Sequence, residues 1–214
     1  MDQIPDIDST LATLNEKKLK KPIVRKLLAA AKHLLFRYGP RKVSIEEICR
    51  EAGVSKMTFY RHFKDKEDIT LLVLQEHFID RMNEYMGILK QDIPFEDKLK
   101  KILDIKIENI KSMNDELLKE ILTDKHSRTG KWLTELNIEE KGMIREFIHS
   151  AQAKGEIRTD VKIDLVLFMI EKSWDLLSDK KILEMYESRT QMLRELNAVL
   201  YYGIIGGKTN NRNS

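Results

Sequence analysis

The chain of 214 residues has one cysteine, four prolines, nine glycines and no long apolar run. A single cysteine, Cys49, excludes a disulfide within the chain and suits a reducing compartment, so we expect a cytoplasmic protein. No stretch of about 18 uninterrupted apolar residues is present, which excludes a transmembrane helix. The first residues are acidic and no apolar segment follows them, so we expect neither a signal peptide nor a membrane partner.

The sequence also lacks the common patterns of enzymes. Its five histidines, at 33, 62, 77, 126 and 149, form no HExxH pair, and no glycine-rich phosphate loop, GxSxG turn or CxxC pair is present. His77, with Glu76 and Asp80, has the residue types of a metal site, but a solvated helix face explains these residues better. We therefore expect a protein that is not an enzyme and that holds no metal and no cofactor.

Apolar residues recur with helical spacing along most of the chain, and no strand pattern or repeat is visible. Glycines, prolines and capping residues divide the pattern into segments. The predicted helices lie at about 23–38, 45–52, 55–63, 69–93, 99–110, 114–122, 131–153, 161–177 and 182–200. This pattern predicts an all-α fold.

Two short helical patterns meet at Gly53, within residues 44–66. Ser44 and Glu47 have the spacing of a capping box, in which the hydroxyl accepts from a backbone N–H and the carboxylate reaches back. Gly53 supplies the left-handed conformation that ends a helix, and Ser55 can cap the helix that follows. Two helices joined in this way match a helix-turn-helix, whose second helix enters the major groove of DNA. The pattern alone is also typical of other small helical hairpins.

The charge is concentrated in one part of the chain. The total is only +3, but residues 16–66 hold 15 Lys and Arg against 5 Asp and Glu, a net charge of +10. A basic segment in an otherwise acidic chain indicates binding to double-stranded DNA. The lysines between Lys17 and Lys21 either follow the DNA, along its backbone or in a minor groove, or form a solvated arm.

The run from Ser44 to Glu67 resembles the DNA-binding signature of the TetR family of transcriptional regulators. The matching positions are Ser44, Ile48, Cys49, Ala52 to Ser55, Thr58 to Tyr60, His62, Phe63 and Lys64 to Glu67. Cys49 replaces the more common alanine, and Met57 stands where many relatives have a small residue. The resemblance implies a three-helix DNA-binding head with a helix-turn-helix, followed by a helical body for ligand binding and dimerisation.

The resemblance assigns roles to residues in the head. Lys56 and Thr58 lie where the recognition helix meets bases or phosphates, and Lys suits the O6 and N7 atoms of guanine. Tyr60 and His62 match the phosphate-contacting pair of the family. Ser44 and Lys66 are expected to contact further phosphates at helix N-termini. The complete predicted DNA-binding set is Ser44, Ser55, Lys56, Met57, Thr58, Tyr60, Arg61, His62 and Lys66.

The body is expected to form a homodimer and to bind a small hydrophobic ligand. In the family, the last two long helices pair with their copies, and both of these helices carry broad apolar faces here. The same stripes are also explained as internal core. Methionine and aromatic side chains adapt to hydrophobic ligands. The predicted lining of the effector pocket is Phe78, Met82, Tyr85, Met86, Met113, Trp132, Phe147, Phe168 and Trp174.

These observations divide the chain into an arm at 1–20, a DNA-binding domain at 21–81 with its motif at 44–63, a body at 82–205 and a polar tail at 206–214. The predicted function is a sequence-specific transcriptional regulator, a repressor that binds a near-palindromic operator as a homodimer and that a ligand releases. The alternative is a DNA-binding architectural or division factor that docks a protein partner and responds to no small molecule.

Overall fold

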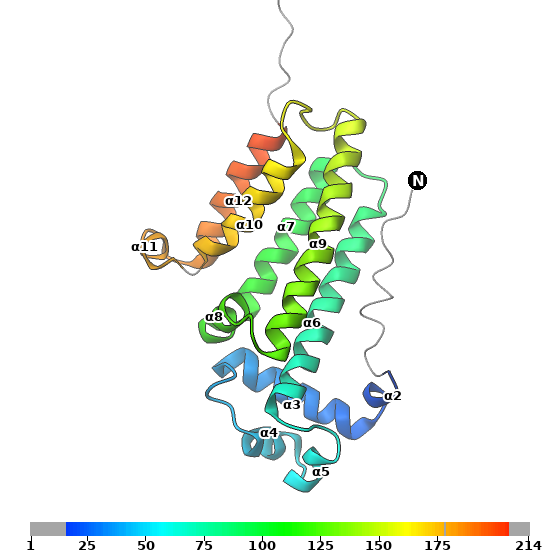
Figure 1. Ribbon diagram of the computed structural model, residues 1–214, viewed down its shortest axis with the longest axis vertical. Helices are drawn as coiled ribbons and strands as arrows, with labels where there is room; N and C mark the ends of the chain where they lie inside the picture. Colours follow the sequence, from blue (N-terminus) through cyan, green and yellow to red (C-terminus); the bar gives the residue numbers. More distant parts are fainter. Residues whose placement is uncertain (1–15, 178, 206–214) are drawn as a thin grey trace, which may run out of the picture. The chain divides into compact units, whose positions relative to one another are not determined.

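The structure is a computed structural model that describes residues 16–177 and 179–205, and this part of the chain contains helices and no strand (Figure 1). The helices are α2 (Glu16–Leu19), α3 (Pro22–Tyr38), α4 (Ile45–Ala52), α5 (Lys56–Tyr60), α6 (Lys66–Leu89), α7 (Phe95–Ser112), α8 (Asp115–Thr123), α9 (Arg128–Ala153), α10 (Ile163–Leu176), α11 (Lys180–Leu183) and α12 (Arg189–Ile205). The all-α prediction is confirmed. None of these helices is long and apolar enough to cross a membrane.

The helices form two compact units. Unit 1 contains the described residues up to Gly87 together with Asn109–Asn137, and unit 2 contains Ile88–Glu108 and the described residues from Ile138 onward. Unit 1 therefore joins the predicted DNA-binding segment to α8 and the first part of α9. The predicted domain boundary after residue 81 had placed these two helices in the other domain. The predicted tail at 206–214 and the first 15 residues of the arm lie outside the described residues.

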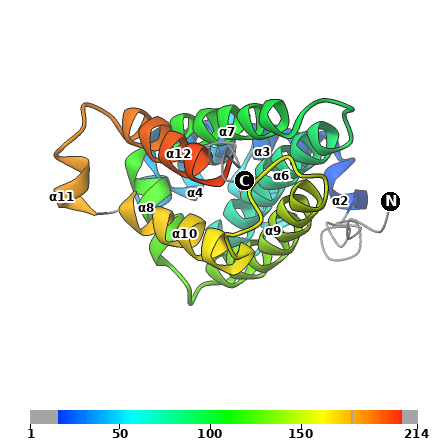
Figure 2. The same cartoon turned by 90° about the horizontal axis from the view of Figure 1, so that it is seen from above.

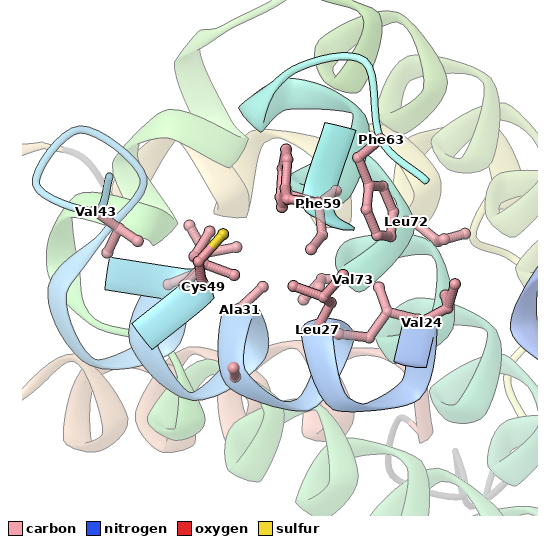
Figure 3. Close-up of a cluster of buried hydrophobic side chains, with 14 residues drawn as sticks. Val24, Leu27, Ala31, Val43, Cys49, Phe59, Phe63, Leu72 and Val73 are labelled. Carbon is pink, nitrogen blue, oxygen red and sulfur yellow. The ribbon is translucent and has the colours of Figure 1, made fainter. Parts of the chain in front are cut away.

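A single apolar cluster holds the helix-turn-helix within unit 1. Phe59 of α5 and Phe63 after it are almost fully buried, and they pack with Leu27 and Ala31 of α3 and Val73 of α6 (Figure 3). The burial of so many apolar side chains stabilises the short helices α4 and α5, since isolated helices of this length are marginal in water. One face of α5 is thus fixed in the core, and the other is left for contacts outside the protein.

The described end of the predicted arm is ordered against the head, which differs from the loose segment expected up to residue 20. Residues 16–19 form the short helix α2, and Arg25 Nε donates to the Leu19 carbonyl at 2.9 Å. Lys18 Nζ lies 4.3 Å from the centre of the Phe63 ring and 3.5 Å from the Asp68 carboxylate. These contacts are tertiary, so helical periodicity gave no signal for them.

Helix α8 is attached to the end of α3 through one asparagine. The Asn114 side-chain amide donates to the carbonyls of Leu35 and Phe36 at 3.1 and 2.9 Å, while its oxygen accepts from Leu117 N at 2.8 Å. Asn114 was predicted to begin this helix, and it is confirmed as the N-cap. The same side chain therefore donates to carbonyls in the last turn of one helix and satisfies a free N–H at the start of another.

Unit 2 contains most of α7, the second part of α9, and α10 to α12 (Figure 2). Its core joins Phe95 to Ile148, Ala151, Ile157 and Val166, and the Phe95 ring stacks on Phe147 with centroids 4.7 Å apart. Several large apolar side chains remain exposed on α10 and α12. They are Leu165, Phe168, Met169, Val199 and Tyr202.

Candidate DNA-binding site

The predicted caps and turn of the helix-turn-helix are confirmed. Glu47 N donates to Ser44 Oγ at 3.2 Å, and Glu47 Oε2 accepts from Ser44 N at 2.8 Å, which completes the capping box. The hydrogen bonds that Ser44 N and Ser44 Oγ donate to the Glu47 carboxylate lower the pKa of that carboxyl, and the backbone bond has the larger effect. Gly53 has φ 67° and ψ 38°, a left-handed conformation that favours glycine. Thr58 N donates to Ser55 Oγ at 3.1 Å, so Ser55 caps α5.

The outward face of α5 carries most of the predicted DNA contacts. Met57 is 75% exposed and Tyr60 is 56% exposed, whereas Phe59 between them is fully buried. Lys56 and Arg61 are also exposed. The buried side of α5 fixes the helix in the protein. Its exposed side therefore presents a tyrosine hydroxyl, a methionine thioether and two cations, which can contact the base edges and phosphates of a DNA groove.

An ion pair joins the two helices of the motif. Lys56 Nζ lies against Glu46 Oε1, and the two side chains are 53% and 57% exposed. The hydrogen bond to Lys56 is the main cause that lowers the pKa of the Glu46 carboxyl, and the same bond raises the pKa of Lys56. Both groups are therefore charged at neutral pH. Sequence spacing alone does not reveal this pair, because the distance between α4 and α5 depends on their tertiary packing.

His62 lies half-buried after α5, in a strongly positive environment. Burial is the main cause that lowers the pKa of its imidazole, and the nearby charges of Lys21, Arg61 and Lys18 lower this pKa further. The ring is accordingly neutral at pH 7 in the free protein. A phosphate beside it would favour the protonated form and raise its pKa.

The structure places Lys66 differently from the other predicted contacts. Its ammonium donates to the carbonyls of Pro40 and Val43 at 2.6 and 2.9 Å. Lys66 thereby ties the start of α6 to the segment between α3 and α4, and two of its three donors point into the protein. Its phosphate contact stays a prediction, but the geometry favours a role in holding that segment in place.

A second cluster that the sequence analysis missed connects the start of α6 to the start of α9 within unit 1. Arg128 N and Nε donate to the two carboxylate oxygens of Glu67 at 2.6 and 3.1 Å, and its guanidinium also contacts Asp65 Oδ1 at 2.6 Å. Glu67 thus satisfies a free N–H in the first turn of α9, where a carboxylate is favourable. Asp65 also caps α6, since it accepts from Asp68 N at 2.8 Å.

The predicted effector-binding residues are distributed over both units. Met82, Tyr85 and Met113 are buried in unit 1. Phe78 and Trp132 belong to the same unit, and the centres of their rings are 6.1 Å apart. Met86 is half-buried in the same unit, whereas Phe147 belongs to the core of unit 2. Phe168 is 55% exposed on α10, and its place in an effector pocket stays a prediction. The side chain of Trp174 lies outside the described part of the structure.

Unit 1 contains a small cavity between α6, α8 and the start of α9. Its lining is Pro40, Thr70, Leu74, Leu117, Glu120, Ile121, Asp124, Thr129, Gly130 and Leu133. Glu120 Oε2 and Thr129 Oγ1 are buried there and make no hydrogen bond within the described residues. Burial raises the pKa of the Glu120 carboxyl, although the charges of Arg41 and Lys66 oppose this effect.

His77 is part of the core and not of a solvated helix face, which corrects the explanation preferred from the sequence. It is 6% exposed, its ring packs edge-on against Phe36 with centroids 4.8 Å apart, and it bonds to the Asn109 side chain. Burial lowers the pKa of the imidazole. Among the residues that the structure describes, no three His, Cys, Asp or Glu side chains are grouped closely enough to hold a metal ion.

A capped helical pair, a glycine turn and an exposed basic and aromatic face on the second helix define a helix-turn-helix DNA-binding protein. Comparison with known proteins gives the family. Residues 27–73, which span α3 to the first turns of α6, match the family described as bacterial regulatory proteins, tetR family. These residues are therefore a DNA-binding domain of the TetR family of bacterial regulatory proteins.

Individual relatives agree with this assignment. The HTH-type transcriptional regulator YerO of Bacillus subtilis is 26% identical over 76% of this chain and 65% of its own length. The fatty acid metabolism regulator protein of Bacillus subtilis is 34% identical, over 31% of this chain and 36% of that protein. The chain thus spans less than two thirds of these relatives.

Solved structures show the same fold. FadR from Bacillus subtilis, in complex with stearoyl-CoA, gives a TM-score of 0.65 at 17% identity and covers 84% of this chain and 98% of its own. The regulatory protein TetR from Rhodobacter sphaeroides gives a TM-score of 0.66 at 17% identity, with coverage of 85% and 98%. The similarity extends to the helices outside the helix-turn-helix, for which the sequence offered no motif.

Proposed function

We propose that this protein is a sequence-specific transcriptional repressor that binds a near-palindromic operator as a homodimer. The observation that carries the proposal is the geometry of α5, whose Phe59 is fully buried while Met57 and Tyr60 on its other side are exposed. This helix lies in a segment with a net charge of +10. An anchored helix with an exposed reading face in a basic segment fits the major groove.

The exposed apolar residues of unit 2 support the dimer. Leu165, Phe168 and Met169 are 53%, 55% and 44% exposed and share one side of α10, because their spacing is three and four residues. Val199 and Tyr202 of α12 are 62% and 73% exposed. Large apolar side chains that are exposed together on one side of a helix are typical of an interface. A two-fold dimer places its recognition helices about one DNA turn apart, ~34 Å.

We further propose that a small hydrophobic molecule releases the repressor from DNA. The similarity of the fold to FadR, which was solved with stearoyl-CoA, makes long-chain acyl-CoA the first ligand class to test. Such a ligand acts by favouring a separation of the two heads that no longer fits both half-sites. The proposal places the protein in the cytoplasm and assigns it no enzymatic activity.

Selection of binding sites from random DNA, followed by gel-shift titration with and without acyl-CoA of several chain lengths, tests the proposal. We expect a two-fold symmetric site and a loss of binding as the matching ligand is added. Binding without a preferred site would overturn the sequence-specific function. A specific site that no hydrophobic ligand weakens, together with a co-purifying protein partner, would favour the architectural or division factor.

The affinity for the operator is expected to rise as the pH falls from 7.5 to 6. His62 is neutral in the free protein because its pKa is lowered, and a DNA phosphate raises this pKa, so binding takes up a proton. The gain is at most about tenfold per pH unit for each head. Fluorescence anisotropy of labelled operator across this range measures the effect. His62→Gln is expected to remove the part of the pH dependence that His62 causes, and an unchanged profile in this variant would contradict the phosphate contact.

Lys66→Met is expected to lower the stability of the protein by about 1.5–3 kcal/mol, since two carbonyls lose a charged donor. This change corresponds to a fall in Tm of roughly 3–12 °C for a chain of this size. Circular dichroism measures Tm, and binding at several salt concentrations counts phosphate contacts. We expect the slope of log affinity against log salt to stay the same. A decrease of about 0.9 per head without a change in Tm would instead show a phosphate contact.

A further inference from the structure

Glu46 is an acidic residue on the surface that the proposed function turns toward DNA. It lies in the first turn of α4, and its carboxylate contacts the ammonium of Lys56, the first residue of α5. More than half of each side chain is exposed. The pair thus presents one carboxylate and one ammonium side by side at the edge shared by the two helices of the motif.

Stability explains this carboxylate only in part, because a carboxylate in the first turn of a helix is favourable but the effect is small at an exposed site. Exposed ion pairs contribute little to folding. The N-cap of α4 is already complete without Glu46, because Ser44 and Glu47 bond to each other. A negative charge at this position also opposes the approach of DNA phosphates, so it weakens nonspecific binding. A residue that costs affinity and adds little stability is best explained by a contribution to specificity.

The chemistry of the pair matches one kind of base pair. In the major groove, guanine presents the acceptors O6 and N7, and cytosine presents the donor N4. An ammonium can donate to guanine and a carboxylate can accept from cytosine, because Lys only donates hydrogen bonds and an ionised Glu only accepts them. The hydrogen bond from Lys56 lowers the pKa of Glu46, which keeps this carboxyl ionised at neutral pH.

We propose that Glu46 is a specificity-determining residue that reads a G·C base pair together with Lys56. Lys56 donates to the guanine, and Glu46 accepts from the cytosine N4 amino group. This inference rests on the proposed sequence-specific binding and names a contact within it. Before binding, the ion pair holds Lys56 close to Glu46, so both groups reach the groove from one place.

The test compares Glu46→Ala with the matched control Glu51→Ala. Glu51 is also an exposed carboxylate on α4, but it pairs with His33 Nδ1 at 3.1 Å and not with α5. Dissociation constants are measured for the selected operator, for each of its single base-pair changes, and for nonspecific DNA. In the wild type, we expect one G·C pair at which substitution costs tenfold or more, as a bidentate contact does.

We expect Glu46→Ala to reduce that discrimination to less than threefold, while affinity for nonspecific DNA rises severalfold. Glu51→Ala is expected to raise nonspecific affinity in the same way and to keep the full discrimination. Equal discrimination at every base pair in wild type and Glu46→Ala would overturn the inference and leave the proposed function intact. A wild-type protein without any preferred site would overturn both.

Lys56→Ala and the double variant Glu46→Ala/Lys56→Ala show whether the two residues read the same base pair. We expect Lys56→Ala to lose discrimination at the G·C pair that Glu46→Ala affects, and the double variant to lose no more than the stronger single variant there. Losses at two different base pairs, or losses that add, would contradict joint recognition.

Discussion

Phe168→Asp is expected to turn the proposed dimer into a monomer and to lower the affinity for a two-fold operator by about 100-fold or more. Phe168 is 55% exposed and lies on α10 between two other exposed apolar residues, Leu165 and Met169. In a dimer these side chains become buried, so an aspartate there loses apolar burial and leaves a buried charge without a partner. Each head then binds alone, without the gain of about 10²–10⁴ that a second linked site supplies.

Sedimentation equilibrium measures the state of association, and gel shift on full operator and isolated half-site measures binding. Ile138→Asp is the control, because Ile138 is 66% exposed but lies on α9. We expect this control to stay dimeric and to bind normally. A dimeric Phe168→Asp protein with wild-type operator affinity would show that α10 does not form the interface.

The local features of the site were predictable from the sequence because each depends on residues a few positions apart. The capping box of Ser44 and Glu47, the left-handed Gly53 and the caps at Ser55 and Asn114 are all set by spacing within one or two helical turns. The positions of most helices followed in the same way, since apolar periodicity and breaking residues act locally. The predicted helix at 182–200 is an exception, because the structure has α11 ending at Leu183 and α12 beginning at Arg189.

The remaining features depend on pairs that are distant in sequence. Glu46 meets Lys56 ten positions away, and Arg128 meets Glu67 more than sixty positions away. Lys66 bonds to carbonyls of the segment before α4, although its position at a helix N-terminus suggested an anion contact. Side-chain type indicates which partners a residue can take, but only the fold decides which of them is near.

The pocket prediction rests on side-chain types that do not by themselves indicate a ligand cavity. Methionine and aromatic residues in a helical body suit a ligand cavity, a buried core and a dimer interface equally well. Met82 is buried in unit 1, Phe147 packs in the core of unit 2, and Phe168 is exposed. One class of side chain therefore serves different purposes, and burial in the structure separates them.

Phe59→Ala is expected to destabilise unit 1 by about 3–5 kcal/mol, the usual cost of removing a buried phenylalanine. Phe59 is fully buried, and its ring lies 5.4 Å from that of Phe63 between centroids, at the centre of the cluster that fixes α5 (Figure 3). Globular proteins are stable by only about 5–15 kcal/mol, so this loss takes a large part of the total. We expect rapid amide hydrogen exchange in α4 and α5, a lower Tm and no detectable operator binding at 37 °C.

The neighbouring Tyr60→Ala separates loss of the fold from loss of a contact. Tyr60 is 56% exposed, and its ring meets Phe59 edge-on, with centroids 5.4 Å apart. We expect its removal to change stability by less than about 1 kcal/mol, as for other surface positions, while binding to all DNA sequences weakens because a phosphate contact is lost. Hydrogen exchange and gel shift on the same samples distinguish the two variants. Equal loss of protection in Tyr60→Ala and Phe59→Ala would mean that Tyr60 supports the core and does not face DNA.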